Sequence, residues 1–62
     1  MKFNLVESKQ GINSYLSEDK SLKLTFFKYS QAVILEREND GERISLLYEE
    51  LAELFLLKKD NE

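Results

Sequence analysis

Apolar and polar residues recur with two different periods along this chain, a two-residue alternation up to residue 38 and a helical spacing from residue 44. The helical stretch covers residues 44 to 59, and its apolar stripe consists of Leu47, Tyr48, Leu51, Ala52, Leu54 and Phe55. Spacings of three and four residues place these side chains on one side of a helix. Ser45 is the expected N-cap. The pattern predicts an amphipathic helix lying on a sheet.

The stretch before residue 44 reads as short strands separated by polar turns. Residues 2 to 8, 12 to 17, 22 to 29 and 32 to 38 are rich in apolar residues and partly alternate. The predicted turns are at residues 9 to 11, 17 to 21 and 30 to 31, with Asp40-Gly41 as a two-residue type I′ turn. The predicted fold is α+β, a twisted antiparallel sheet of four to five strands followed by one helix.

The turns also predict which residues face one another across the sheet. A two-residue turn at residues 30 to 31 sets Phe26 opposite Leu35, and it sets Lys23 opposite Glu38. The Asp40-Gly41 turn sets Glu38 opposite Arg43. The expected core lies on one face and combines Leu22, Leu24, Phe26, Val33, Leu35 and Ile44 with Leu47, Leu51, Leu54 and Phe55 of the helix.

The predicted helix carries more apolar surface than one sheet can cover. Leu46, Leu56 and Leu57 project on the side of Glu49, Glu50 and Glu53. We expect this surplus to form a second contact, most simply in a homodimer.

Length and composition limit how such a chain is stabilised. With 62 residues it is expected to be one domain over residues 1 to 62, and it has no Cys and no His. Small domains usually gain stability from disulfides, a metal or oligomerisation, and the first two routes are nearly closed here. The N-terminus has no apolar run long enough for a signal peptide or a membrane span. We expect a cytoplasmic protein, with its last residues, 60 to 62, fraying.

Charge is unevenly distributed. Residues 1 to 43 hold seven basic and seven acidic side chains, so the formal charge of −3 arises in the helix and tail. Nucleic-acid binding is not excluded, although the usual basic excess is missing.

The chain lacks the side chains on which most catalytic sites depend. It has no His, no Cys and no Gly-rich phosphate loop, so we expect neither an enzyme nor a cofactor. Glu49, Glu50 and Glu53 form an acidic cluster, but consecutive helical acids are usually a solvated face, and no metal site is predicted.

The second sheet face carries aromatic and basic side chains together. Lys23, Thr25, Phe27 and Tyr29 alternate along one strand, Tyr15 is a candidate to join them, and Lys20 and Lys28 lie near the rims. Rings flanked by cations suit single-stranded nucleic acid, because bases stack on rings and cations follow phosphates. The alternative is that the rings pack against a partner subunit or the N-terminal strands.

The segment from residue 41 to 54 resembles the end of the positive cofactor four family of transcriptional coactivators, which bind single-stranded DNA. Ile44-Ser45-Leu46 matches its Gly-Ile-Ser-Leu stretch, Glu49-Glu50-Leu51 and Leu54 match the following helix, and Arg37-Glu38 is similar to the end of an earlier strand. The resemblance covers residues 22 to 57. The family's basic loop is reduced here to residues 40 to 43, and its Trp is replaced by Leu51.

The resemblance implies four antiparallel strands and a helix, a symmetric dimer and single-stranded DNA bound along the sheet. The residues that it implies for phosphate contacts are Lys23, Lys28, Arg37 and Arg43, and those for base stacking are Phe27 and Tyr29. The predicted function is that of a non-enzymatic accessory protein of replication or transcription. The alternative is an inhibitor or adaptor that binds a larger protein through its Leu-rich, acidic helix.

Overall fold

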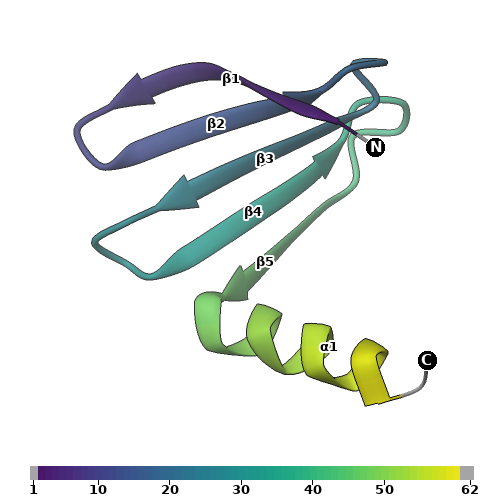
Figure 1. The fold of residues 1–62 in the computed structure, drawn as a ribbon. Helices are drawn as coiled ribbons and strands as arrows, with labels where there is room; N and C mark the ends of the chain where they lie inside the picture. The colour runs from purple at the N-terminus through teal and green to yellow at the C-terminus, as the bar shows by residue number, and fades with distance from the viewer. Residues whose placement is uncertain (1, 61–62) are drawn as a thin grey trace.

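Five strands and one helix follow one another in the computed structural model, which describes residues 2–60 (Figure 1). The elements are β1 (Phe3–Lys9), β2 (Ile12–Ser17), β3 (Leu22–Phe27), β4 (Ala32–Arg37), β5 (Arg43–Leu47) and α1 (Tyr48–Asp60). Each strand pairs antiparallel with its neighbour in sequence, so the sheet order is β1-β2-β3-β4-β5. The α+β prediction is confirmed. The expected fraying concerns residues 61 and 62, which lie outside the described residues, and residue 60 ends the helix.

The two-residue type I′ turn joins β1 to β2, where a hairpin is predicted at residues 9 to 11, and does not join β4 to β5. Gln10 and Gly11 connect β1 to β2 with φ of 45° and 82°, as a two-residue type I′ turn requires. The predicted turn at Asp40-Gly41 is wrong, since five residues join β4 to β5. The Asp40 carboxylate holds this longer loop by accepting the backbone N–H of Glu42 at 3.0 Å.

The β3–β4 and β4–β5 pairings are displaced by two residues from the predicted register. Phe26 lies opposite Val33 rather than Leu35, and Glu36 rather than Glu38 lies opposite both Lys23 and Arg43. The reason is that both connecting loops are longer than the predicted two residues. Because side chains alternate with a period of two, this displacement leaves the residues of β3 and β4 on their predicted faces.

The helix begins four residues later than its pattern predicts. Residues 44 to 47 pair with β4, and Ser45 lies opposite Ile34 in the sheet, so the predicted N-cap at Ser45 is wrong. The start of α1 is instead held by Glu50, whose Oε1 accepts the Leu47 N–H at 2.7 Å. The Tyr48 N–H donates to the Gln31 carbonyl at 2.8 Å, which ties the helix to the β3–β4 loop.

The sheet has two unlike faces, because residues paired across strands share a face. The helix face bears Phe3, Leu5, Asn13, Tyr15, Ser17, Leu22, Leu24, Phe26, Val33, Leu35, Arg37, Ile44 and Leu46. The open face bears Asn4, Ile12, Ser14, Leu16, Lys23, Thr25, Phe27, Ala32, Ile34, Glu36, Arg43, Ser45 and Leu47. Beyond a bulge in β1, Glu7 and Lys9 pair with Ser14 and Ile12 and join the open face.

Aromatic rings join α1 to the helix face. The Phe26 ring meets Tyr15 edge-on at 5.7 Å between centroids and Tyr48 at 6.2 Å. Val33, only 2% exposed, is the one apolar side chain among the described residues that is fully buried.

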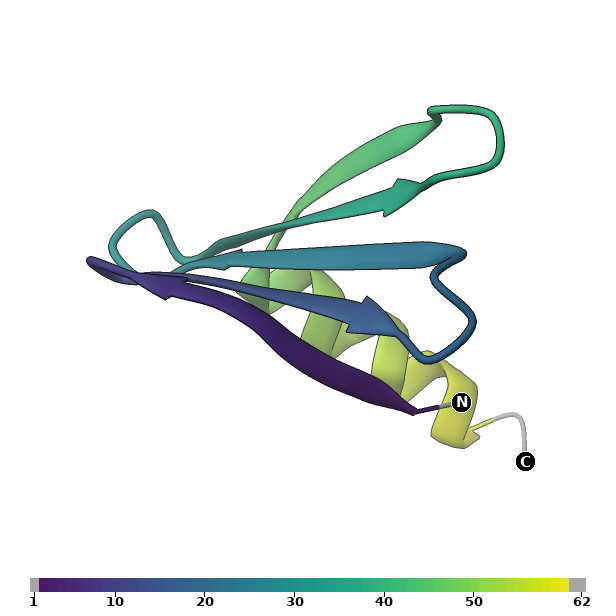
Figure 2. The ribbon, with the colours of Figure 1, turned by 90° about the horizontal axis from the view of Figure 1, so that it is seen from above.

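The rest of the predicted core is not closed. The six predicted sheet residues do share one face, but Ile44 is 52% exposed and Leu47 lies on the open face. Leu54 and Phe55 remain 53% and 68% exposed, so they do not cover the sheet. Figure 1 shows that α1 leaves the end of β5 and runs apart from β1–β4, and in Figure 2, seen from above, it passes beneath the sheet. The helix therefore covers the sheet through its first turns alone.

A hollow of about 530 Å³ lies between the first turns of the helix and the sheet. It is lined by Phe3, Asn13, Tyr15, Leu24, Phe26, Tyr48 and Leu51.

Candidate nucleic-acid interface

Strand β3 presents three of the predicted binding residues on the open face. Lys23, Thr25 and Phe27 occupy alternate positions of the central strand, and each is half-buried between neighbours on β2 and β4. Thr25 Oγ1 lies 3.3 Å from Ser14 Oγ, which fixes the small polar centre of this face. The helix lies on the other face, so none of the elements described over residues 2–60 covers this surface.

Lys28 and Tyr29 belong to the β3–β4 loop and not to the strand in which they were predicted. The Lys28 N–H donates to the Gly11 carbonyl at 2.9 Å, and the Tyr29 side chain is 82% exposed. A methyl group on Gly11 would lie 2.5 Å from Cε2 of Tyr29, so the ring rests against the β1–β2 turn. These two residues therefore extend the end of the sheet near Phe27.

Arg43 lies on the open face beside an acid. Its Nη2 is 3.6 Å from Glu36 Oε2, and the Arg43 side chain is 68% exposed. Glu36 also lies opposite Lys23, so this carboxylate is the neighbouring acid of both cations. An exposed pair of this length contributes about 0 to 1 kcal/mol, which leaves Arg43 able to turn toward another anion.

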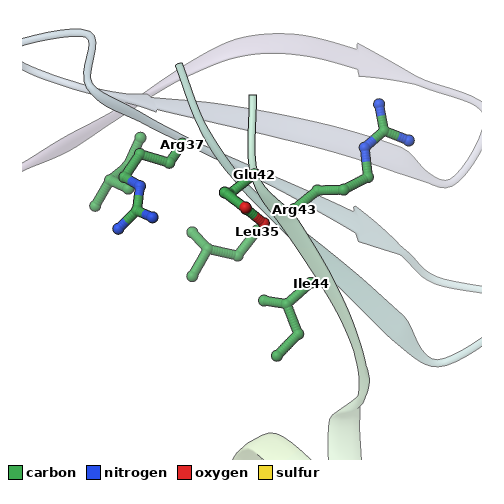
Figure 3. A pocket seen from close by; sticks show the side chains of 6 residues that line it. Leu35, Arg37, Glu42, Arg43 and Ile44 are labelled. Atoms are coloured by element: carbon green, nitrogen blue, oxygen red, sulfur yellow. The ribbon is translucent and has the colours of Figure 1, made fainter. Parts of the chain in front are cut away.

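Arg37 lies on the helix face and apart from the other predicted cations. Its Nη2 is 2.8 Å from Asp40 Oδ2, and its Nε donates to both Asp40 oxygens at 3.1 Å. This hydrogen bonding lowers the pKa of Asp40 and raises the pKa of Arg37. Arg37 and Arg43 both line a hollow of about 210 Å³, together with Leu22, Leu35, Glu42 and Ile44. In Figure 3 the Arg43 side chain extends away from Leu35, Arg37 and Ile44.

Tyr15 does not join the open face. It packs edge-on against Phe26 on the helix face, so the prediction that it continues the aromatic row is wrong. Its neighbours Ile12, Ser14 and Leu16 occupy the open face in its place. The sequence shows that Ile12, Ser14 and Leu16 alternate with Asn13 and Tyr15 along β2. Only the observed pairing with β3 shows which of these two sets lies on the same face as Phe27.

Lys9 is a cation on the open face that the sequence pattern did not single out. It lies opposite Ile12, which in turn lies opposite Phe27. The bulge between Leu5 and Glu7 changes which face the end of β1 presents. No local sequence signal marks that bulge.

The predicted partner-contact residues are divided between strand and helix. Leu46 was expected in the helix but lies in β5 on the helix face, half-buried. Leu56 and Leu57 lie in α1, and each is 59% exposed. Leu46 and Leu57 line a hollow of about 390 Å³ with Glu50, Glu53 and Leu54.

At the β2–β3 end of the sheet, Asp19 orders the polar turn of residues 17 to 21. Its Oδ1 accepts hydrogen bonds from the Ser21 hydroxyl at 2.6 Å, the Ser21 N–H at 3.0 Å and the Ser17 hydroxyl at 2.8 Å. These donors, the Ser21 hydroxyl first, lower the pKa of Asp19 to about 2. Ser17, at the end of β2, is only 2% exposed, so the turn is anchored by a buried hydroxyl.

Within the described residues, no three potential metal ligands gather into one group, and no helix has the length and apolar character needed to cross a membrane. No protein-family model, curated protein or solved structure matches this chain.

Proposed function

We propose that this protein binds single-stranded nucleic acid, with little dependence on base sequence, on the open face of its sheet, as an accessory protein of replication or transcription. One observation carries the proposal. The helix and the hollow lie on one face, and this leaves Lys23, Thr25 and Phe27 uncovered on the other. A ring flanked by cations on a sheet surface provides stacking and phosphate contacts together.

The arrangement of charge supports this assignment despite the net negative charge of the chain. Lys9, Lys23 and Arg43 on the open face outnumber Glu7 and Glu36 there. The acids of α1 lie on the other side of the sheet, and exposed charges separated by about 8 to 10 Å or more are largely screened at physiological salt. A phosphate approaching the open face therefore meets a locally positive surface.

The aromatic side chains supply the second part of the binding energy. Phe27 lies half-buried at the end of β3, and Tyr29 is 82% exposed two residues later, with its ring against the β1–β2 turn. Stacking of a base on an aromatic ring contributes about 1 to 3 kcal/mol and tolerates any base. Binding is therefore expected to be weakly dependent on sequence.

The two arginines provide a matched test of the proposed surface. We expect Arg43→Gln and Lys23→Gln each to weaken binding of a labelled single-stranded oligonucleotide about 3- to 10-fold at low salt, measured by fluorescence anisotropy. Each change should also reduce the slope of log affinity against log salt by about 0.7. Arg37→Gln removes the same charge from the helix face and should leave affinity within about 2-fold.

Two outcomes would overturn the proposal. One is the absence of saturable binding at low salt by a folded wild-type protein. The other is equal weakening by Arg37→Gln and Arg43→Gln, which would mean that only overall charge matters. Duplex competitor should displace the single strand poorly, because paired bases cannot stack on Phe27 and Tyr29.

A protein-binding function is the second candidate, favoured by the apolar side chains exposed on α1. Leu54, Phe55, Leu56 and Leu57 are each more than half exposed. An inhibitor or adaptor would use this helix, and its binding would be insensitive to Lys23→Gln and Arg43→Gln.

A further inference from the structure

Strand β5 forms one edge of the sheet. It is the last strand in the order β1-β2-β3-β4-β5, and four of its five residues are exposed. Figures 1 and 2 show no other element of residues 2–60 along its outer side. A strand edge with free N–H and C=O groups is a template for the pairing of another extended segment.

Hydrogen bonds at the two ends of β5 show which of its backbone groups point toward β4. The Glu42 carbonyl accepts the Arg37 N–H at 2.8 Å, and the Tyr48 N–H donates to the Gln31 carbonyl at 2.8 Å. In an antiparallel ladder this direction alternates from one residue to the next. The even-numbered residues from 42 to 48 therefore face β4, and the odd-numbered residues between them face outward.

The outward backbone groups are not all free. The Leu47 N–H donates to Glu50 Oε1 at 2.7 Å, so the start of α1 closes one end of the edge. Arg43 and Ser45 keep an outward N–H and an outward C=O each, with no strand beside them among residues 2–60. An antiparallel segment would find a short ladder at these two residues.

The other edge of the sheet, β1, is less suited to such pairing. Its register shifts between Leu5 and Glu7, and this bulge interrupts the ladder. Bulges are a usual protection of edge strands. β5 pairs with β4 from Arg43 to Leu47 without a shift, so its outer side is regular.

Two hollows lie along β5 where side chains of an added strand would project. The smaller, about 210 Å³, has Ile44 in its wall, and the larger, about 390 Å³, has Leu46 and Leu54 together with Glu50 and Glu53. Ile44 and Leu46 are two residues apart and share the helix face. The two hollows therefore match side chains two positions apart on one added strand.

The walls of the hollows indicate which side chains they accept. In the larger hollow, a Lys or Arg would lay its aliphatic stem on Leu46 and Leu54 and bring its cation to Glu50 and Glu53. The smaller hollow is lined by Ile44 and two leucines and suits an apolar side chain.

We propose that the outer edge of β5 binds an extended segment of another protein as a sixth, antiparallel strand. The segment hydrogen-bonds to Arg43 and Ser45, and it carries a basic residue opposite Leu46 and an apolar residue opposite Ile44. This inference concerns the edge and the helix face, and it does not depend on nucleic-acid binding by the open face.

Charge favours another protein over β5 of a second copy of this chain. If Ser45 paired with Ser45 of an antiparallel copy, Ile44 of the copy would lie opposite Leu46 and bring no cation to the larger hollow. Glu42 of the copy would follow on the same face, toward Glu50. Like charges brought together across a strand pair are destabilising.

The first experiment tests the backbone ladder with a synthetic peptide, fluorescein-labelled Thr-Thr-Lys-Thr-Val-Thr-Thr, titrated by fluorescence anisotropy. Ser45→Pro removes an N–H that faces outward, a substitution that edge strands tolerate, whereas Ser45→Ala keeps this N–H. We expect Ser45→Pro to raise the peptide dissociation constant about 10-fold or more and Ser45→Ala to change it less than about 2-fold. Circular dichroism establishes that both variants fold.

The second experiment tests the larger hollow without changing β5, and it decides the question if Ser45→Pro does not fold. Glu53→Lys should weaken binding of the peptide about 5-fold or more, and it should strengthen binding of the same peptide with Glu in place of Lys. Glu49→Lys makes the same charge change in α1 outside the hollow and should alter either affinity by less than about 2-fold.

Three outcomes would overturn the proposal. One is no saturable peptide binding by the folded wild-type protein, and another is equal weakening by Glu49→Lys and Glu53→Lys. The third is a dimer in sedimentation equilibrium that Ser45→Pro dissociates, because a second copy would then occupy the edge. Lys23→Gln, which should weaken oligonucleotide binding, should leave peptide binding unchanged, so this proposal and the proposed function can fail separately.

Discussion

The two faces of this sheet carry similar backbone and very different side chains. The helix face gathers aromatic rings, with Tyr15 and Tyr48 packed edge-on around Phe26. The open face mixes one ring, Phe27, with Lys23, Glu36 and the small polar pair Ser14 and Thr25. A single sheet with one short helix can build an apolar core on one side only, so the other side is available for binding.

The comparison also separates what each face contributes to the stability of the fold. Val33 on the helix face is 2% exposed, whereas its neighbour Ile34 on the open face is only half-buried. Apolar burial contributes roughly 25 cal/mol per Å² of surface removed from water. Most of the side-chain stabilisation is therefore expected on the helix face, and substitutions on the open face should act mainly on function.

The largest predicted effect comes from placing the same charge on either face of β4. Val33→Asp puts an unpaired carboxylate into the one apolar position that is fully buried among the described residues, and we expect loss of cooperative folding at neutral pH. Ile34→Asp at the next position should remain folded and lose about 1 kcal/mol in urea denaturation followed by circular dichroism. Equal losses at the two positions would contradict the asymmetry of the sheet.

A second pair of variants compares adjacent rings. Phe26→Ala removes the ring that contacts both Tyr15 and Tyr48, and it should reduce the free energy of unfolding by about 2 to 3 kcal/mol. Phe27→Ala should reduce stability less and weaken oligonucleotide binding about 5- to 100-fold, as loss of one stacked base predicts. Urea denaturation should therefore show the larger loss for Phe26→Ala, and fluorescence anisotropy should show the larger loss of oligonucleotide affinity for Phe27→Ala. The same variant being the more impaired in both assays would contradict this expectation.

The attachment of the helix to the helix face provides a third comparison. Glu50→Ala removes the carboxylate that accepts the Leu47 N–H, and we expect a loss of about 1 kcal/mol in unfolding free energy. Glu49→Ala deletes the neighbouring acid of the same turn, which does not accept this N–H, and should lose no more than about 0.3 kcal/mol. A matching loss for Glu49→Ala would show that helix charge, and not the cap, is responsible.

A smaller effect is expected on the open face from the acid between its two cations. Glu36→Gln removes the carboxylate that lies 3.6 Å from Arg43 and opposite Lys23. Oligonucleotide affinity should rise about 2- to 5-fold at low salt, since both cations then face phosphate alone. Glu42→Gln, an acid of the β4–β5 loop, is the control, and an equal gain there would indicate a general charge effect.

The smallest predicted effect is a pH dependence at the β2–β3 turn. Hydrogen bonds from Ser21 and Ser17 lower the pKa of Asp19 to about 2, below its value of 3.8 in an unfolded chain. The stabilisation is therefore present above about pH 4 and is lost as pH falls from about 4 to 2. Asp19→Asn should flatten this part of the stability profile measured by thermal unfolding, whereas Glu18→Gln should leave it unchanged.

The order of residues along each strand and along the helix carries two kinds of information. Alternation along β3 and β4 assigns Phe26 and Val33 to one face and Phe27 and Ile34 to the other, and a two-residue error in register leaves this assignment intact. The acidic start and basic end of the helix are equally plain. The α+β class follows from these patterns, which leave the number of strands at four or five.

Other features were decided by contacts between distant segments. Residues 44 to 47 fit both a strand and a helix, and pairing with β4 placed them in the sheet. Tyr29 lies outside β3 because the loop between β3 and β4 has four residues. Arg37 forms an ion pair with Asp40 in the following loop.

For this protein the sequence by itself determined the faces of β3 and β4, because side-chain alternation is a local property of each strand. Only the tertiary structure decided where the helix starts, which cations share a surface and how little of α1 the sheet covers. These depend on loop lengths, on the bulge in β1 and on the direction in which α1 leaves β5. None of them has a periodic signal along the chain, since each results from the pairing of segments that are apart in sequence.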